Sequence, residues 1–164
     1  MPPGSLLPSK ALLKEELLRV LGADLAARER AYRSALEAAT HQEAKPENDK
    51  DTRALEQSYL ARGEAARVEE LRAGFAEVQA LAVAAFDADG PARLGAVVVT
   101  EEGDQRTVFF IAPHGGGARL ASDTVQVVTP KSPLGRALLG AKAGEECEVT
   151  LAGKLRALAV IAVS

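Results

Sequence analysis

The stretch HQEAKPENDKDTRALEQSYL, from His41 to Leu60, decides the fold because it is a charged, proline-marked turn between two long helix-forming segments. Pro46 cannot lie inside a helix unless it opens one, so the first helix must end before it. Two helices of similar length joined by a short turn predict an antiparallel hairpin with a polar tip at about residues 41–51. Such a tip is suited to carrying carboxylates into the site of a partner.

The first helix is expected to begin after Ser9, which is a suitable N-cap, and to run to about Thr40. About 31 residues at roughly 1.5 Å each give an arm on the order of 45 Å long. Stepping at three-and-four spacing predicts an inward stripe that is leucine-rich at the base and alanine-rich towards the tip. Its members are Leu13, Leu17, Val20, Asp24, Ala27, Ala31, Ser34 and Ala38.

The second helix is expected to start near Pro46 to Asp49 and to end at about Ala82. Its apolar residues keep near-heptad spacing, which is typical of an antiparallel coiled coil. The predicted seam consists of Ala61, Val68, Leu71, Phe75, Val78 and Ala82, with Leu55 and Tyr59 four residues apart nearer the tip.

Beyond the hairpin, the hydrophobic period changes from helix to strand. Residues 86–93 form a linker, because Gly90-Pro91 and two aspartates stop a helix. Apolar runs at 94–99, 107–112, 125–129, 146–151 and 155–163 predict strands, and 132–140 predicts a short helix with Ser132 as its N-cap. The chain is therefore expected to be α+β: a helical hairpin over 1–85 and a small antiparallel sheet with one helix over 94–164.

Composition narrows the function classes. A net charge of −3 and a pI near 5.5 argue against duplex DNA as a partner, since neutralising phosphates needs a net basic face.

The single cysteine, Cys147, is expected to be a packed or half-exposed thiol. No apolar run is long enough to span a membrane and no secretion signal is evident, so we expect a cytoplasmic protein. His114–Gly117 lacks the companion motifs of an esterase or a phosphate loop and predicts a turn.

Two local motifs, in this order, resemble the bacterial Gre transcript-cleavage factors. The first is Pro46–Asn48 at the tip, continued by Ala54, Glu56 and Gln57 in the second helix. The second is Ser132–Gly140, SPLGRALLG, followed by Gly144-Glu145. The resemblance covers most of the chain and implies a C-terminal domain with an FK506-binding-protein-like (FKBP-like) fold.

The resemblance also implies RNA polymerase as the partner. The C-terminal domain would dock at the mouth of the secondary channel, with docking candidates Ser132, Pro133, Leu134 and Arg136. The hairpin would bring a functional tip near the nascent RNA 3′ end; its residues are Glu43, Glu47, Asn48, Asp49 and Asp51. Among these, Glu47, Asp49 and Asp51 would share Mg²⁺ with the polymerase, because hard Mg²⁺ takes carboxylate oxygens. The chain itself is then an accessory factor and not an enzyme.

One departure from the family pattern leaves the outcome open. Cleavage-active members have an aspartate three residues before the tip glutamate, and here that position is Ala44. The alternatives are stimulation of cleavage and a channel-blocking inhibitor without cleavage activity. Two alternative functions belong to other classes: a coiled-coil adaptor, and an FKBP-like chaperone or isomerase. A chaperone or isomerase of that kind needs a pocket lined by aromatic side chains, and residues 94–164 offer only Phe109 and Phe110.

Overall fold

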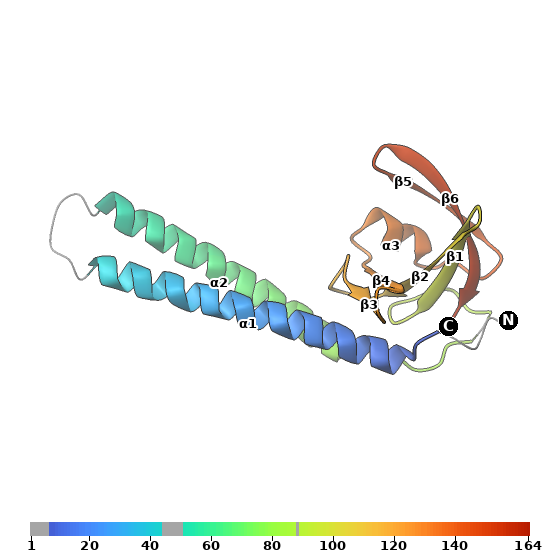
Figure 1. Cartoon of the computed structure of the whole chain (residues 1–164), viewed down its shortest axis with the longest axis horizontal. Coiled ribbons are helices and arrows are strands. Elements are labelled where there is room, and N and C mark those ends of the chain that lie inside the picture. Colours follow the sequence, from blue (N-terminus) through green and yellow to red (C-terminus); the bar gives the residue numbers. More distant parts are fainter. Residues whose placement is uncertain (1–6, 44–50, 88) are drawn as a thin grey trace. The chain divides into compact units, whose positions relative to one another are not determined.

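The computed structural model describes residues 7–43, 51–87 and 89–164, and its first half is a pair of long antiparallel helices (Figure 1). Helix α1 spans Lys10–Glu43 and α2 spans Asp51–Gln79. Ser9 caps α1 as predicted: its Oγ accepts from the Leu12 amide at 3.1 Å and its carbonyl accepts from the Leu13 amide at 3.0 Å. Helix α1 runs three residues past the predicted end at Thr40. The predicted start of α2, near Pro46 to Asp49, lies outside the described residues.

Helix α2 ends three residues before the predicted end at Ala82. Two lysine side chains of α1 bind backbone carbonyls of the segment that follows α2. Lys14 Nζ donates to the Leu81 carbonyl at 2.8 Å, and Lys10 Nζ donates to the Ala84 carbonyl at 2.7 Å. These lysines satisfy carbonyls that follow the helix and lack partners within it. Lys10 also lies 3.7 Å from the Phe86 ring centroid; burial, and then the nearby Arg93, lower the pKa of Lys10. The end of α2 is thus set by groups more than sixty residues away in sequence.

The predicted seam of α2 is confirmed over most of its length. Ala61, Val68 and Val78 are buried, and Leu71 and Phe75 are half-buried. Ala82 lies beyond the helix and is exposed, as are Leu55 and Tyr59 nearer the tip.

The predicted stripe of α1 is wrong from Val20 to Ser34, and its last member, Ala38, is half-buried as predicted. Leu13 and Leu17 are buried, but Val20, Asp24, Ala27, Ala31 and Ser34 are exposed. After Leu17, the next buried residue is Leu21, four positions on, and not Val20, three positions on. The side chains that face inward are therefore shifted by one position from the predicted ones. The observed inward side chains are Leu21, Leu25, Tyr32, Ala35, Ala38 and Ala39.

The second half is a six-stranded sheet with a short helix, in the order β3-β4-β2-β1-β6-β5. The strands are β1 Val97–Glu102, β2 Gln105–Ile111, β3 Arg119–Leu120, β4 Val125–Val128, β5 Glu146–Leu151 and β6 Lys154–Val163. Two-residue turns at Gly103-Asp104 and Ala152-Gly153 close hairpins β1–β2 and β5–β6. Both Ala152 and Gly153 have positive φ, of 51° and 77°, which is the geometry that such hairpins favour.

The α+β class is confirmed, but the sheet is mixed and not wholly antiparallel. Strand β4 pairs with β2 in parallel, from Val108 opposite Val125 to Ile111 opposite Val128. The chain crosses over between them through residues 112–124, which include the predicted turn at His114–Gly117 and the short strand β3. Alternation of apolar residues carries no information on strand direction, so the sequence pattern could not reveal this pairing.

Helix α3, Pro133–Leu138, closes one face of the sheet. Ser132 caps it as predicted, with its Oγ accepting from the Gly135 amide at 3.0 Å. Leu138 is fully buried in a core cluster with Val98, Phe109, Ile111 and Val160. The opposite sheet face is also buried, at Val97, Phe110, Val125 and Val127. Burial on both faces explains why residues 97–99 of β1 and 108–111 of β2 are consecutive apolar residues.

Contacts divide the chain into two units. One comprises Met1–Arg19 with Ala76–Ser164, and the other comprises Val20–Phe75. The base of the hairpin therefore belongs with the sheet: Glu16 Oε2 accepts from the Ala121 amide at 2.9 Å, and His114 Nε2 lies 3.2 Å from Glu77 Oε2. The division predicted from sequence, with a linker at 86–93, stays a prediction.

Candidate functional site

The tip residues singled out from the sequence lie at the edge of what the structure describes. Glu43 is the last residue of α1 and Asp51 is the first of α2, and their side chains are not described. Glu47, Asn48 and Asp49 lie outside the described residues. The structure therefore places the two helix ends from which the tip emerges, and the grouping of its carboxylates stays a prediction.

Acidic residues along the shaft of the hairpin have structural partners. Arg72 contacts Glu29 of α1 at 3.0 Å and Glu69 at 2.5 Å, and Arg28 lies 3.8 Å from Glu64. The hydrogen bond to Glu29, followed by the charge of Glu69, raises the pKa of Arg72. The Glu29–Arg72 and Arg28–Glu64 pairs link α1 to α2, and Glu69 pairs with Arg72 within α2. Among the residues that the structure describes, no group of three or more His, Cys, Asp or Glu side chains could hold a metal ion.

The four docking candidates on α3 separate into two kinds. Ser132 and Leu134 have structural roles: the Ser132 hydroxyl also donates to the Thr129 carbonyl at 2.9 Å, and Leu134 packs against the core cluster. Pro133 and Arg136 are exposed. Arg136 donates to the Lys131 carbonyl at 3.0 Å, which holds its side chain at the start of the helix. Pro133 and Arg136 are therefore the members that can meet a partner without unfolding the helix.

A small cleft of about 30 Å³ opens beside Leu134 on the sheet face that α3 covers. Its apolar lining comes from Phe109, Leu134, Leu151 and Leu158, and its polar lining from Thr100, Glu102, Gln105, Thr107 and Arg156. No motif in the sequence predicted this cleft. Its lining residues come from β1, β2, α3, β5 and β6, and no local spacing in the sequence brings them together.

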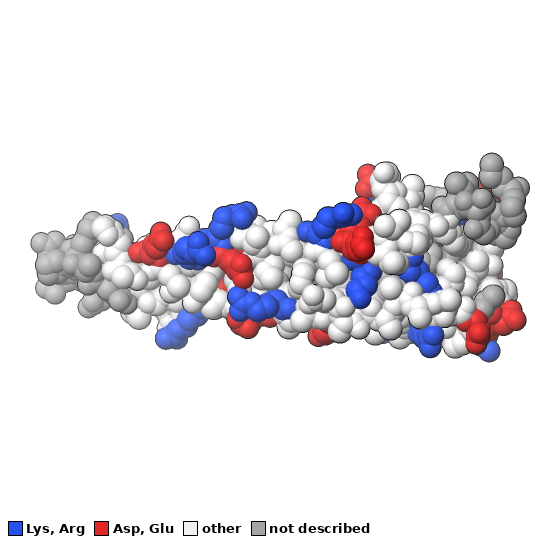
Figure 2. Space-filling model, turned by 90° about the horizontal axis from the view of Figure 1, so that it is seen from below, with Lys and Arg blue, Asp and Glu red and all other residues white. Residues whose placement is uncertain are grey.

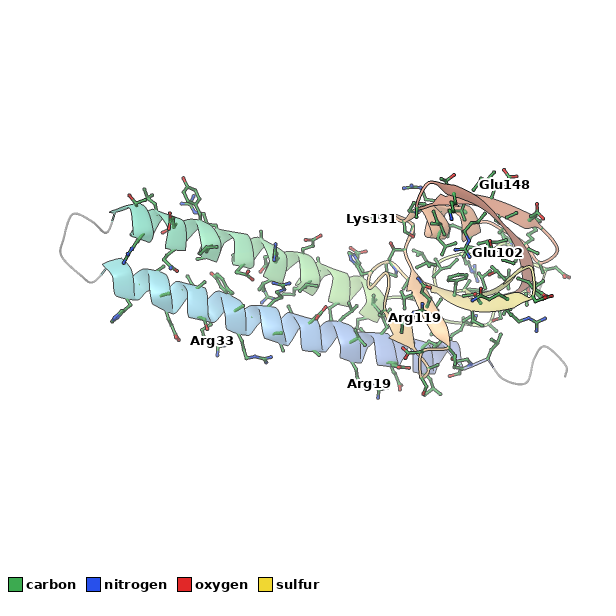
Figure 3. All side chains as sticks on the ribbon, turned by 45° about the horizontal axis from the view of Figure 1, so that its top comes forward. Arg19, Arg33, Glu102, Arg119, Lys131 and Glu148 are labelled. Atoms are coloured by element: carbon green, nitrogen blue, oxygen red, sulfur yellow. The ribbon has the colours of Figure 1, made fainter. Side chains whose placement is uncertain are left out.

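Glu102 and Arg156, which both line the cleft, form an ion pair. Glu102 is labelled in Figure 3. Arg156 Nε lies 3.0 and 2.9 Å from the two carboxylate oxygens of Glu102, and its Nη2 contacts one of them as well. This two-point geometry suits a guanidinium and a carboxylate. The hydrogen bond from Arg156 holds the pKa of Glu102 below its usual value and outweighs the opposing effect of desolvation. Both groups are charged at neutral pH.

Cys147 is a free, half-buried thiol that packs against the core cluster, which agrees with the prediction of a packed thiol. Burial, and secondarily the charge of Glu145, raise its pKa. A raised pKa disfavours the thiolate, which is the reactive form. The geometry gives Cys147 a packing role.

Among the described residues, no helix combines the length and the apolar character needed to cross a bilayer.

Comparison with known proteins points to one family. Residues 88–164 match the model of the C-terminal domain of the transcription elongation factors GreA and GreB. No curated protein sequence matches significantly. Among solved structures, the GreA factor homolog 1 (Gfh1) of Thermus thermophilus is 16% identical, with 90% of this chain and 94% of that chain covered and a TM-score of 0.37. Gfh1 of Thermus aquaticus is 18% identical, with 94% and 95% covered and a TM-score of 0.40.

Proposed function

Residues 88–164 of this chain belong to the GreA/GreB C-terminal family of transcription elongation factors, and from that premise we propose that the protein binds RNA polymerase and modulates elongation through its secondary channel. The C-terminal domain docks at the mouth of the channel, and the helical hairpin enters it. The hairpin is the working part of the molecule and the polymerase performs any chemistry.

The observation that carries this proposal is the length of the hairpin. Helices α1 and α2 contain 34 and 29 residues. At about 1.5 Å per residue, the shorter one spans roughly 44 Å. A helical arm of this length needs extensive pairing to be stable, and its ion pairs and buried seam supply that pairing. An arm that ends in a run of carboxylates is suited to a site deep inside a partner.

At the tip, Glu47, Asp49 and Asp51 would offer oxygen ligands to a magnesium ion of the polymerase. Carboxylate oxygens are the ligands that Mg²⁺ prefers, and a second ion in such a site activates water for hydrolysis of a phosphodiester. Glu43 and Asn48 flank them and would orient the tip near the nascent RNA 3′ end. The chain supplies ligands and position, and hydrolysis takes place in the polymerase.

We assign docking on the polymerase to Pro133 and Arg136. The neighbouring cleft would add to this docking surface. Both side chains are exposed, and the capping hydroxyl of Ser132 and the buried part of Leu134 hold the helix that presents them. The cleft beside Leu134 adds an apolar hollow with a charged rim at Glu102 and Arg156.

Ala44 favours a second candidate function that would use the same docking surface. It replaces the aspartate that cleavage-active relatives carry three residues before the tip glutamate. Losing one carboxylate weakens a metal site but leaves an arm that fills the channel. The second candidate is therefore a channel-blocking regulator that docks in the same way and inhibits elongation or competes with cleavage factors.

The test is cleavage of nascent RNA in stalled, backtracked complexes of the cognate polymerase, with the wild type and the triple variant Glu47→Ala, Asp49→Ala, Asp51→Ala. A cleavage factor should accelerate cleavage, and the triple variant should lose most of that acceleration while still binding. A channel blocker should give no acceleration and should slow an authentic cleavage factor in competition.

A matched control removes three shaft carboxylates instead, in Glu15→Ala, Glu37→Ala, Glu70→Ala. All three side chains are exposed and lie on the described parts of α1 and α2. This control changes the net charge by the same amount and should behave like the wild type. The proposal fails if the wild type neither binds the polymerase nor affects either assay.

A further inference from the structure

Two ion pairs join the helices of the hairpin near the middle of its shaft. Arg72 Nη2 of α2 lies 3.0 Å from Glu29 Oε1 of α1, and Arg28 Nη1 of α1 lies 3.8 Å from Glu64 Oε2 of α2. All four residues belong to the unit Val20–Phe75. Figure 2 shows acidic and basic side chains next to one another along the hairpin, with uncharged surface between them. We call these two contacts the cross-helix pairs.

The first cross-helix pair slants along the hairpin. Gly22 and Phe75 lie opposite each other, because a Cβ at Gly22 would be 3.5 Å from the Phe75 ring. Since the helices are antiparallel and rise equally per residue, each step along α1 towards the tip matches one step back along α2. Glu29, seven steps beyond Gly22, is therefore level with residue 68. Arg72 lies four residues from that level on the base side.

The second cross-helix pair slants the other way. Arg28, by the same count, is level with residue 69, and Glu64 lies five residues from that level on the tip side. Sliding α2 towards the tip would therefore carry Glu64 away from Arg28. Sliding α2 towards the base would carry Arg72 away from Glu29. The two pairs together oppose sliding in both directions.

The seam between these pairs and the tip resists sliding weakly by itself. Alanine does not fill a hole between the side chains of a facing helix as leucine does, so alanine contacts specify the axial register of two helices poorly. Charged pairs beside a coiled-coil seam set the orientation of the helices where the seam leaves it open. The buried and half-buried residues of this part of the seam include Ala35, Ala38, Ala39, Ala54, Ser58 and Ala61.

The register matters because both helices carry the tip. Glu43 is the last residue of α1 and Asp51 is the first of α2. A slide by one residue moves one helix end about 1.5 Å past the other. A misplacement of about 1 Å can cost an active site roughly 100-fold in rate. Bending the arm in the plane of its helices also needs such a slide, because the inner helix then follows a shorter path than the outer one.

We propose that Arg28, Glu29, Glu64 and Arg72 are positioning residues, which hold the two helix ends in one register so that the tip carboxylates meet the polymerase site as a group. This role rests on the function proposed above, whereas the bracing is a property of the hairpin alone. Arg28 and Arg72 are exposed, and exposed ion pairs contribute little to folding stability. Removing the pairs should therefore leave the hairpin helical and loosen its register.

The test is the distance between spin labels at Ser34→Cys and Thr52→Cys, measured by pulsed electron–electron resonance in the full-length chain with Cys147→Ala. Both sites are exposed, one on each helix, between the cross-helix pairs and the tip. Ser34 is level with residue 63, eleven residues from Thr52, so the labels are offset by about 16 Å along the arm and a slide changes their distance directly. The variant Glu29→Gln, Glu64→Gln, which removes both pairs, should broaden the distance distribution about twofold.

Glu37→Gln, Glu70→Gln is the matched control. It also removes two negative charges from the shaft, one on each helix, and both side chains are exposed. No ion pair among the described side chains includes either residue. This control should keep the distance distribution of the wild type. Circular dichroism of every variant checks that the hairpin remains helical.

A charge exchange tests whether the contact itself acts as the brace. Arg72→Glu should broaden the distance distribution, because it sets like charges against each other at Glu29. The double variant Glu29→Arg, Arg72→Glu should narrow the distribution again. A general loss of helix stability would make the double variant broader than either single variant, so recovery identifies the contact between the two residues.

Polymerase assays separate the positioning role from the proposed function. The variant without cross-helix pairs should bind the polymerase with the affinity of the wild type, since the proposed docking surface is on α3. Its maximal effect at saturation, on cleavage or on competition with a cleavage factor, should fall about tenfold. An unchanged distance distribution would overturn the bracing, and an unchanged maximal effect would overturn the positioning role. A wild type without effect on the polymerase would overturn the proposed function and the positioning role together, while the distances alone decide the bracing.

Discussion

Gly135 is a position where a single carbon atom should decide the stability of the C-terminal domain. A Cβ built there would lie 1.8 Å from the Thr129 carbonyl oxygen and 2.5 Å from its carbon. Because the obstacle is backbone, no side chain can rotate away. We expect Gly135→Ala to lower the free energy of unfolding of this domain by about 3 kcal/mol or more, measured by chemical denaturation.

Gly63 should respond in the opposite direction. It lies within α2 on an exposed face, and a Cβ there would meet nothing within 4 Å. Glycine in a helix interior costs about 1 kcal/mol relative to alanine. Gly63→Ala should therefore raise the thermal stability of the hairpin, followed by helical circular dichroism. An unchanged or lower thermal stability would contradict this prediction.

The Glu102–Arg156 pair makes stability depend on pH. Because Arg156 holds the pKa of Glu102 below its usual value of 4.5, the folded state favours the ionised carboxylate. This contribution is fully present above pH 4.5 and is lost as the pH falls through the lowered pKa of the folded state. Compared with the wild type, Glu102→Gln should lose less stability on acidification below pH 4.5, as denaturation at several pH values would reveal. Equal losses in both proteins would contradict the pairing.

At the scale of elements, the β3–β4 turn is the most constrained piece of backbone in the described chain. Ala121, Ser122 and Asp123 have φ values of 51°, 54° and 67° in succession. For residues other than glycine, the left-handed region costs about 1–2 kcal/mol each. The carboxylate of Glu16 and the hydroxyl of Thr124, which donates to the Ala121 carbonyl at 2.6 Å, stabilise this turn.

Substitutions at Ser122 should reveal the strain. Ser122 is exposed, so its replacement changes backbone preference more than packing. Ser122→Gly should stabilise the domain by about 0.5–1 kcal/mol, because relief of the left-handed strain exceeds the extra entropy that glycine loses on folding. Ser122→Val should destabilise it, since a β-branched residue tolerates positive φ least. Thermal unfolding of the two variants measures their order of stability. A Ser122→Val protein more stable than Ser122→Gly would contradict the strain at this position.

The two helices of the hairpin show how far an element can be predicted. The α2 seam was predicted correctly because Val68, Leu71, Phe75 and Val78 stand out against polar neighbours. On α1 the choice between Val20 and Leu21 was decided by the partner helix: a Cβ at Gly22 would lie 3.5 Å from the Phe75 ring, so this face approaches α2. One helix by itself does not contain that information.

At the scale of the whole molecule, the proposed function assigns docking and tip chemistry to different parts of the chain. The triple variant Glu47→Ala, Asp49→Ala, Asp51→Ala should therefore still bind the polymerase, which a pull-down with the purified polymerase would measure. A variant that no longer binds would contradict this division.

The docking surface shows what a motif can and cannot reveal. The Ser132-Pro133 motif predicted a capped helix, because an N-cap and a proline at the first helical position act within one turn. The same motif did not separate the structural residues, Ser132 and Leu134, from the exposed ones, Pro133 and Arg136. Exposure depends on which face of α3 meets the sheet, and that was not encoded locally.

The sequence by itself determined the helical hairpin, the change of hydrophobic period beyond it and the cap of α3. These features depend on neighbours within a few residues, where backbone preference and amphipathic period act directly. Only the tertiary structure decided the parallel pairing of β2 with β4, the end of α2 beneath Lys10 and Lys14, and the cleft beside Glu102 and Arg156. Each of these joins groups far apart in the chain, and such a contact exists only once packing has chosen among many compatible local patterns.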